Sequence, residues 1–169
     1  MVKFLMNAKQ AIKTALTSTQ TIVGWYLGDL SDADLLVRPV PHSNHIAWQL
    51  GHLISAEIAL LGKNLPGVAY PELPAGFADR HNKTTAASDP PKGFGTKGEY
   101  LDLFTRVRGA TIAALENGTE ADLDKPTVGD MAKFAPTLGA LILLQSNHTL
   151  MHAGQFTVVR RKLGKPVLF

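Results

Sequence analysis

His148 and His152 are four residues apart in a segment whose apolar residues recur every three or four positions. At this spacing on an α-helix, two side chains lie one turn apart on the same face, within reach of a single metal ion. The predicted face consists of Leu141, Gln145, His148, His152, Gln155 and Val159. Since the neighbouring residues Leu138, Ile142 and Phe156 are apolar, we expect this face to point into the protein.

His52 is a third candidate ligand, in an otherwise apolar segment where it shares a predicted helix face with His45 and Gln49. If His52 faces His148 and His152 across a bundle, three neutral nitrogens meet on one side of an ion. The other positions then remain open to water or substrate, as in a catalytic metal site. The nitrogens should lie about 2.0–2.3 Å from a shared ion, or about 4–5 Å from one another without it. The same pattern also fits core histidines that are hydrogen-bonded to glutamines or backbone carbonyls.

Four segments have the apolar periodicity of long helices, and no segment alternates like a strand. The predicted helices span residues 4–28, about 44–61, about 97–117 and about 137–163. Two short helical turns are predicted near residues 31–34 and 119–123. This order predicts an all-α four-helix bundle, with residues 1–169 forming a single domain.

Residues of the kinds that begin and end helices mark the boundaries of these segments. Ser43 or Asn44 is a suitable N-cap for the second helix, and Gly62 is placed to end it. Thr96 and Glu99 form a capping-box pattern at the start of the third helix.

The connection between the second and third predicted helices, residues 62–98, is long and holds five of the ten prolines and six of the fifteen glycines. Long loops of this kind tend to be lids, binding loops or partner contacts. We expect Tyr70, Phe77 or Phe94 to anchor it on the bundle, where it walls the histidine pocket or a dimer contact. The alternative is a passive surface excursion.

The composition excludes several classes of protein. A net charge of +3 over 169 residues, without a run of like charges, does not predict nucleic-acid binding. The absence of cysteine excludes disulfides and thiolate ligands. The longest apolar stretch, residues 138–144, is far shorter than a membrane helix, so we expect a cytoplasmic domain without a membrane partner.

The other motifs and residues in the sequence that could suggest a site are expected to be structural or solvated. The Gly93–Gly98 segment fits G-x-G-x-x-G but follows a proline-rich loop rather than a strand, so it does not predict a dinucleotide site. His42 and His81 are expected in solvated loops. Trp25 and Trp48 are expected in the core.

Two segments resemble the signature stretches of the DinB-like superfamily of metal-binding four-helix bundles. They are residues 44–53, NHIAWQLGHL, and residues 148–156, HTLMHAGQF. The resemblance implies that His52, His148 and His152 bind a divalent metal, zinc or nickel. Residues expected around these ligands, as ring-orienting partners or pocket wall, are Gln49, Gln145, Asn147, Gln155 and His45. For His45, an exposed position at the start of the helix is the alternative.

The resemblance leaves the activity open among several classes. Some relatives are S-transferases that use small thiols, some are isomerases, and others have been proposed as metal-dependent hydrolases. A hydrolase needs a positioned base, but the sequence has no His-Glu-x-x-His. Glu57, five residues after His52, should point about 140° away from it. This favours a small-molecule thiol as the partner, with a non-catalytic ligand-binding module or a purely structural metal as alternatives. The resemblance also implies a homodimer.

Overall fold

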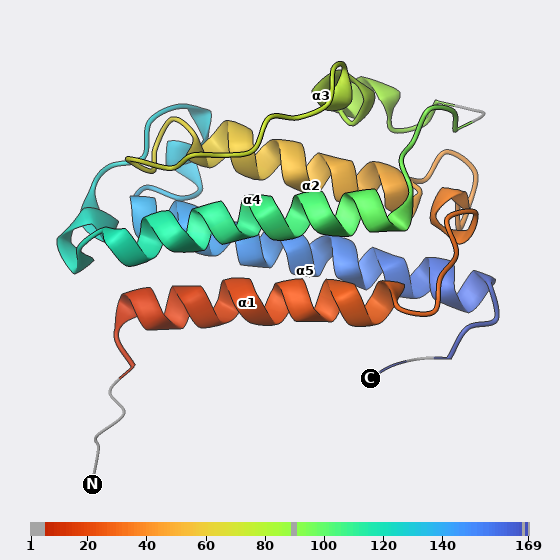
Figure 1. Cartoon of the computed structure of the whole chain (residues 1–169), viewed down its shortest axis with the longest axis horizontal. Helices are drawn as coiled ribbons and strands as arrows, with labels where there is room; N and C mark the ends of the chain where they lie inside the picture. The colour runs from red at the N-terminus through yellow and green to blue at the C-terminus, as the bar shows by residue number, and fades with distance from the viewer. Residues whose placement is uncertain (1–5, 89–90, 167, 169) are drawn as a thin grey trace, which may run out of the picture.

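Four long helices lie side by side in the computed structural model (Figure 1). They are α1 (Ala8–Leu27), α2 (Ile46–Leu61), α4 (Lys97–Asn117) and α5 (Leu138–Lys162). The structure describes residues 6–88, 91–166 and 168, so the first two positions of the predicted first helix lie outside the described residues. No strand forms within the described ranges. The predicted all-α four-helix bundle is confirmed.

The ends of the helices follow the expected signals with one correction. Thr96 and Glu99 form the predicted capping box of α4, and Thr137 caps α5. The N-cap of α2 is His45, rather than Ser43 or Asn44. The reason is that Nδ1 of His45 accepts the backbone N–H of Trp48 at 3.2 Å, as a serine or asparagine oxygen does at other helix starts.

A buried ion pair joins all four long helices at the centre of the bundle. Arg108 of α4 and Glu57 of α2 are each 1% exposed and lie 2.9 Å apart. Arg108 also donates to the Leu16 carbonyl and the Thr19 hydroxyl of α1, and to the Thr149 hydroxyl of α5. Such a pair is stable only when its remaining hydrogen-bonding groups are satisfied, which this network achieves.

Apolar side chains fill the bundle on both sides of this pair. One cluster centres on Leu50, Phe104 and Phe156, and the other on Leu16 and Leu141. Trp25 is 56% exposed, so its predicted core position is wrong. It belongs to α1 but does not occur among the buried residues of that helix, which recur from Ile12 to Leu27 every three or four positions.

The described part of the long connection 62–98, residues 62–88 and 91–98, folds back along the outside of α2 (Figure 1). It contains α3 (Phe77–Arg80) and the single-turn helix η2 (Lys83–Thr85). Phe77 is buried, and Tyr70 and Phe94 are partly buried against the core. The predicted packing of this connection on the bundle is confirmed.

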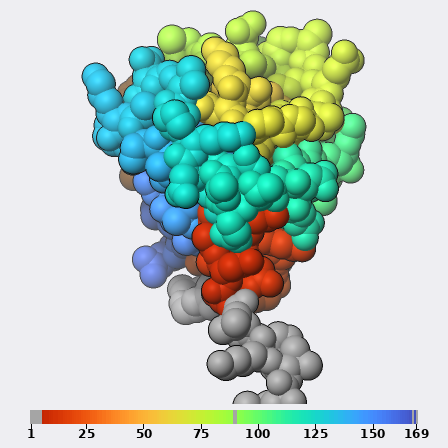
Figure 2. All heavy atoms as spheres, turned by 90° about the vertical axis from the view of Figure 1, so that its left-hand side faces the viewer, coloured from red at the N-terminus to blue at the C-terminus, as the bar shows by residue number. Residues whose placement is uncertain are grey.

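The end of the bundle on the left of Figure 1 is closed by the first residues of this connection and by the stretch between α4 and α5. Figure 2 looks onto this end and shows the segment after α2 beside the one between α4 and α5. The latter contains η3 (Glu120–Asp124) and η4 (Asp130–Lys133). Asn64 joins the two segments, because its side chain accepts from the Val128 N–H and donates to the Val128 carbonyl.

A further single-turn helix, η1 (Asp34–Leu36), lies between α1 and α2, where a helical turn was expected. In the part of the chain that the structure describes, no helix combines the length and apolar character needed to cross a membrane.

Candidate metal centre

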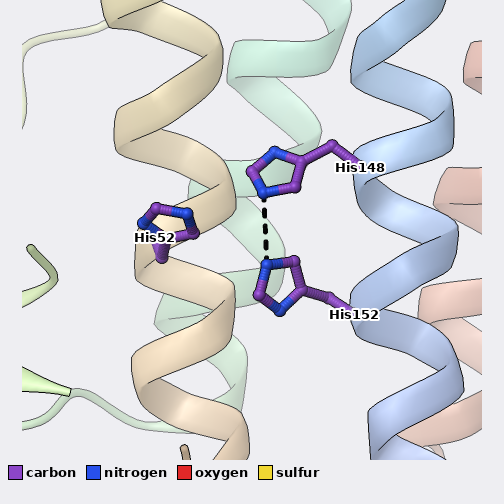
Figure 3. A group of neighbouring side chains, drawn as sticks. All are labelled: His52, His148 and His152. Carbon is purple, nitrogen blue, oxygen red and sulfur yellow. Dashed lines mark hydrogen bonds between the residues drawn. The ribbon is translucent and has the colours of Figure 1, made fainter. Parts of the chain in front are cut away.

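His52, His148 and His152 come together between α2 and α5. Figure 3 shows the ring of His52 on α2 facing the two rings that project from α5. One ring nitrogen from each histidine lies within 4.8 Å of the others. This distance agrees with the 4–5 Å expected for three ligands of one ion. Among the described residues, this is the one group of three or more possible metal ligands.

The two histidines of α5 are spaced like ligands of one ion. Nε2 of His148 and Nε2 of His152 lie 3.2 Å apart. Two nitrogens that each bind a tetrahedral zinc at about 2.05 Å are separated by about 3.3 Å. The helical one-turn spacing of these residues therefore brings their nitrogens to the separation that a shared ion requires.

Gln49 orients the ring of His152. Nδ1 of His152 lies 2.8 Å from the Gln49 side-chain oxygen and donates to it. The amide orientation follows from the other end of the same group, since Nε2 of Gln49 donates to the Asn44 carbonyl at 3.2 Å. With its proton on Nδ1, His152 presents the lone pair of Nε2 toward His148, which is the form a metal ligand needs.

Burial keeps all three imidazoles neutral. Desolvation, followed by electrostatic interaction with His52 and Arg108, lowers the pKa of His148 to about 4. Desolvation, followed by His148 and His52, lowers the pKa of His152 to about 3. The pKa of His52 is also lowered by burial, although a hydrogen bond with the backbone of His81 opposes the shift. Neutral imidazole is the metal-binding form, so the site is ready to bind a cation at pH 7.

The indole of Trp48 and the backbone of His81 hold His52 in place. The indole of Trp48 stacks on the His52 ring at 4.9 Å between centroids with an interplanar angle of 7°. Trp48 is buried, as expected, but it also contacts the site. The backbone of His81 forms a hydrogen bond with the His52 ring.

His81 is buried against α2, so its predicted solvated position is wrong. It is 1% exposed. Its Nδ1 donates to the Phe77 carbonyl at 2.7 Å, and its Nε2 accepts from the Tyr100 hydroxyl at 2.8 Å. A Cβ at Gly51 would lie only 2.1 Å from a ring carbon of His81, so the connection docks on α2 where a residue without a side chain makes room. Desolvation lowers the pKa of His81 to about 4.

A cavity of about 740 Å³ opens over the three histidines between α2, α5 and the connections. Its lining residues are Asn44, Trp48, His52, Ala56, Ala59, Leu60, Lys83, Ala86, Met131, Leu144, Gln145, Asn147, His148, Met151 and His152. This volume lies within the range of small-ligand sites. None of the described lining residues is acidic, and Lys83 is their one lysine or arginine.

Some of the other predicted pocket residues lie at the site, and others do not. Gln49 contacts a candidate ligand, and Gln145 and Asn147 line the cavity. Gln155 is exposed and does not line the cavity, because three residues beyond His152 the helix has turned about 60° away from it. His45 is buried as the N-cap of α2, so the alternative of an exposed position is wrong, and it does not line the cavity.

Lys83 and His81 are the residues near the site that sequence reasoning missed. Both belong to the connection 62–98, far along the chain from His52. The signal that pointed to them was indirect: aromatic residues in a proline-rich segment predicted that the segment docks on the bundle. The residues that meet α2 were not predicted.

Residues 15–156 match the DinB superfamily, so the chain belongs to this family. The fold is similar to that of YfiT from Bacillus subtilis, which is described as a probable metal-dependent hydrolase with an unusual four-helix bundle topology. The two chains share 15% identity with a TM-score of 0.67, covering 98% of this chain and 94% of YfiT.

A conserved protein from Enterococcus faecalis has the same fold, with 17% identity and a TM-score of 0.66. The match covers 95% of this chain and all of that one. No curated protein matches the chain.

Proposed function

We propose that this protein binds a divalent metal ion through His52, His148 and His152 and uses it to activate a small thiol for transfer to an electrophile. The observation that carries the proposal is the set of neutral imidazole nitrogens facing a cavity in which no described lining residue is acidic. Imidazole ligands suit zinc and nickel. An ion held by three neutral ligands keeps its full charge and promotes ionisation of a thiol or water at neutral pH.

The position of Glu57 favours thiol transfer over base-assisted hydrolysis. Glu57 is the acidic residue nearest to His52 in the sequence, but its carboxylate accepts from Arg108 and Thr111 inside the bundle. It is therefore not available to take a proton from water in the cavity. In a transfer reaction the thiol loses its proton to solvent, and sulfur bonds to the electrophilic carbon. The leaving group departs with the electrons of the broken bond.

Metal-dependent hydrolysis is the second candidate function. It is supported by the description of YfiT as a probable metal-dependent hydrolase, together with the shared fold. A three-histidine ion acting on water can hydrolyse an activated ester without a carboxylate base. A non-catalytic role, in which the site only holds or senses a small ligand, predicts binding without turnover.

Metal analysis combined with two assays separates these functions. Protein purified without chelators is analysed for zinc and nickel. The metal-loaded protein is then assayed for thiol transfer to 1-chloro-2,4-dinitrobenzene and for hydrolysis of p-nitrophenyl acetate. We expect one metal ion per chain and thiol-dependent transfer that is lost in His148→Ala. Ester hydrolysis without thiol transfer would favour the hydrolase, and binding without either turnover would favour the sensing module.

His42→Asn is the matched control for the loss of an imidazole. His42 is exposed, outside the cavity lining, and has a φ of 62°. Asparagine tolerates this left-handed backbone conformation, so the substitution removes an imidazole without adding backbone strain. The control should retain both the metal and the activity.

The outer face of α5 supports the proposal that the protein forms a homodimer. Leu143, Leu150, Met151 and Val158 are between 40% and 64% exposed on this helix. Clustered exposed apolar side chains mark contact surfaces more often than free surface. Sedimentation equilibrium of the wild type and Leu150→Asp tests this, with a dimer expected for the first and a monomer for the second.

A further inference from the structure

The cavity over the histidines has two chemically different ends. Asn44, Trp48 and Lys83 lie toward the N-terminal end of α2, whereas Ala59 and Leu60 lie toward its C-terminal end. Leu60 is eight residues beyond His52, which corresponds to about 12 Å along the helix. The three histidines therefore lie between a polar end and an apolar end.

The polar end contains Lys83, whose turn of backbone the fold ties to α2. Trp48 donates its indole N–H to the Asn82 carbonyl and the Thr85 hydroxyl, the residues on either side of the Lys83–Thr84 pair. This ties the single turn η2 to α2 and places Lys83 at the cavity. Lys83 is exposed, and its charge is therefore accessible to a ligand entering from solvent.

The apolar end is built from small and flexible side chains. Ala56, Ala59 and Leu60 of α2 face Leu144 of α5 and Met131 of η4 across the cavity. The alanines leave space, and the unbranched methionine adapts to ligand shape. Such a surface stabilises an alkyl or aryl group by removing it from water, which tightens binding by up to about fourfold for each buried CH₂.

The charge balance of the whole site also favours an anion. Lys83 is positive, and no acidic side chain lines the described part of the cavity. A bound divalent cation would add two further positive charges. A cavity lined by charge of one sign attracts ligands of the opposite sign.

We infer that the site accepts an amphipathic organic acid, with its acidic group at Lys83, its reacting atom over the three histidines and its apolar group against Ala59, Leu60 and Met131. This inference rests on the proposed function for the role of the reacting atom. The recognition of the acid and of the apolar group follows from Lys83 and the apolar wall alone.

The experiment uses 3-mercaptohexanoate and its neutral counterpart 3-mercaptohexan-1-ol as probes. Both carry a thiol between a polar end and a propyl chain, and they differ only in the charged group. Affinities are measured by titration calorimetry with metal-free and zinc-loaded protein, for the wild type and for Lys83→Gln. Lys133→Gln is the matched control, because it removes the same charge from an exposed lysine that does not line the cavity.

We expect the wild type to bind the acid roughly twofold to fivefold tighter than the alcohol at low salt, as is typical of one accessible ion pair. This preference should occur in both the metal-free and zinc-loaded forms and should decrease with salt. It should disappear in Lys83→Gln and persist in Lys133→Gln. A preference that is unchanged in Lys83→Gln, or absent from the wild type, would overturn the assignment of Lys83.

A third probe, 3-mercaptopropionate, tests the apolar end. Without the three carbons of the propyl chain it should bind up to about sixtyfold more weakly than 3-mercaptohexanoate, and equal affinity would overturn the placement of the apolar group.

The role of the metal gives an independent readout. Under the proposed function, zinc should tighten binding of both the acid and the alcohol. If zinc has no effect while the acid preference depends on Lys83, the thiol-activating function fails and the amphipathic-acid inference is supported. If zinc tightens both probes equally and no acid preference exists, the inference fails and the function is supported.

Discussion

Gly51→Ala tests whether the contact between α2 and the connection 62–98 is as close as the structure shows. The added Cβ would lie 2.1 Å from Cδ2 and 2.4 Å from Cγ and Nε2 of His81. Real Cβ contacts are more than 1 Å longer, so one of the two groups must move. The ring of His81 cannot move freely, because both its nitrogens are hydrogen-bonded, to Phe77 and Tyr100.

The expected cost follows from three contributions. Overpacking a buried contact costs about 1–3 kcal/mol. Displacing the His81 ring weakens up to two hydrogen bonds, each of about 1 kcal/mol. Alanine in place of glycine inside a helix stabilises the folded state by about 0.5–1 kcal/mol in the opposite direction. The net loss is therefore about 2 kcal/mol, which for a chain of this length lowers the Tm by roughly 4–8 °C.

Calorimetric melting of metal-free protein measures this loss, with Gly109→Ala as the control. Gly109 lies within α4 with nothing within 4 Å of an added Cβ, so Gly109→Ala should raise the Tm. In the double variant Gly51→Ala/His81→Ala the ring is absent. Its loss of stability should therefore be smaller than the sum of the losses of the two single variants. A Tm for Gly51→Ala at or above that of the wild type would refute the close contact.

Three further predictions concern the metal, the buried ion pair and pH. His148→Ala should abolish stoichiometric metal binding while the helical circular dichroism remains, since apolar helix faces hold the bundle; unfolding on metal removal would show a structural site. Glu57→Gln should lower the free energy of unfolding by about 3–5 kcal/mol, because it leaves Arg108 charged and unpaired in the core, and a urea midpoint equal to that of the wild type would contradict this. The pKa of His81 falls to about 4 in the folded protein, whereas an unfolded histidine titrates near about 6.5. The unfolded state therefore binds more protons between these values, and stability should decrease as the pH falls from about 6.5 to about 4. Urea titrations of metal-free protein should show a shallower pH dependence for His81→Gln than for the wild type, and an unchanged dependence would contradict the shift.

Local signals in the sequence were sufficient to predict the helices and the three-histidine cluster. The pair His148 and His152 lies within one helix turn, and helix geometry alone places its members together. The Thr96–Glu99 capping box is equally local. His52 was predicted to face the pair because a histidine in a strongly apolar helix must lie where it finds a polar partner. The resemblance to the DinB-like superfamily indicated the same three residues independently.

Features that depend on how distant segments pack could not be read from the sequence. The positions of His81 and Lys83 depend on where the connection 62–98 returns to α2. Gly51 permits that approach, but a single glycine inside a helix does not identify the ring that covers it. The position of Gln155 could not be predicted for a different reason. A residue three positions from His152 lies at the edge of the helix face that carries the histidines. Small rotations of the helix then decide whether its side chain points into the cavity or into solvent.

The residues that line the cavity belong to two kinds of structure, which differ in how well they tolerate substitution. The histidines project from long helices that the Glu57–Arg108 pair locks together, whereas Lys83 and Met131 come from short turns in the connections. Substitutions in such turns disturb few buried contacts. Ligand preference can therefore diverge within this scaffold while the metal ligands stay fixed, and libraries randomised at positions 83, 86 and 131 are a direct route to redesigning its specificity.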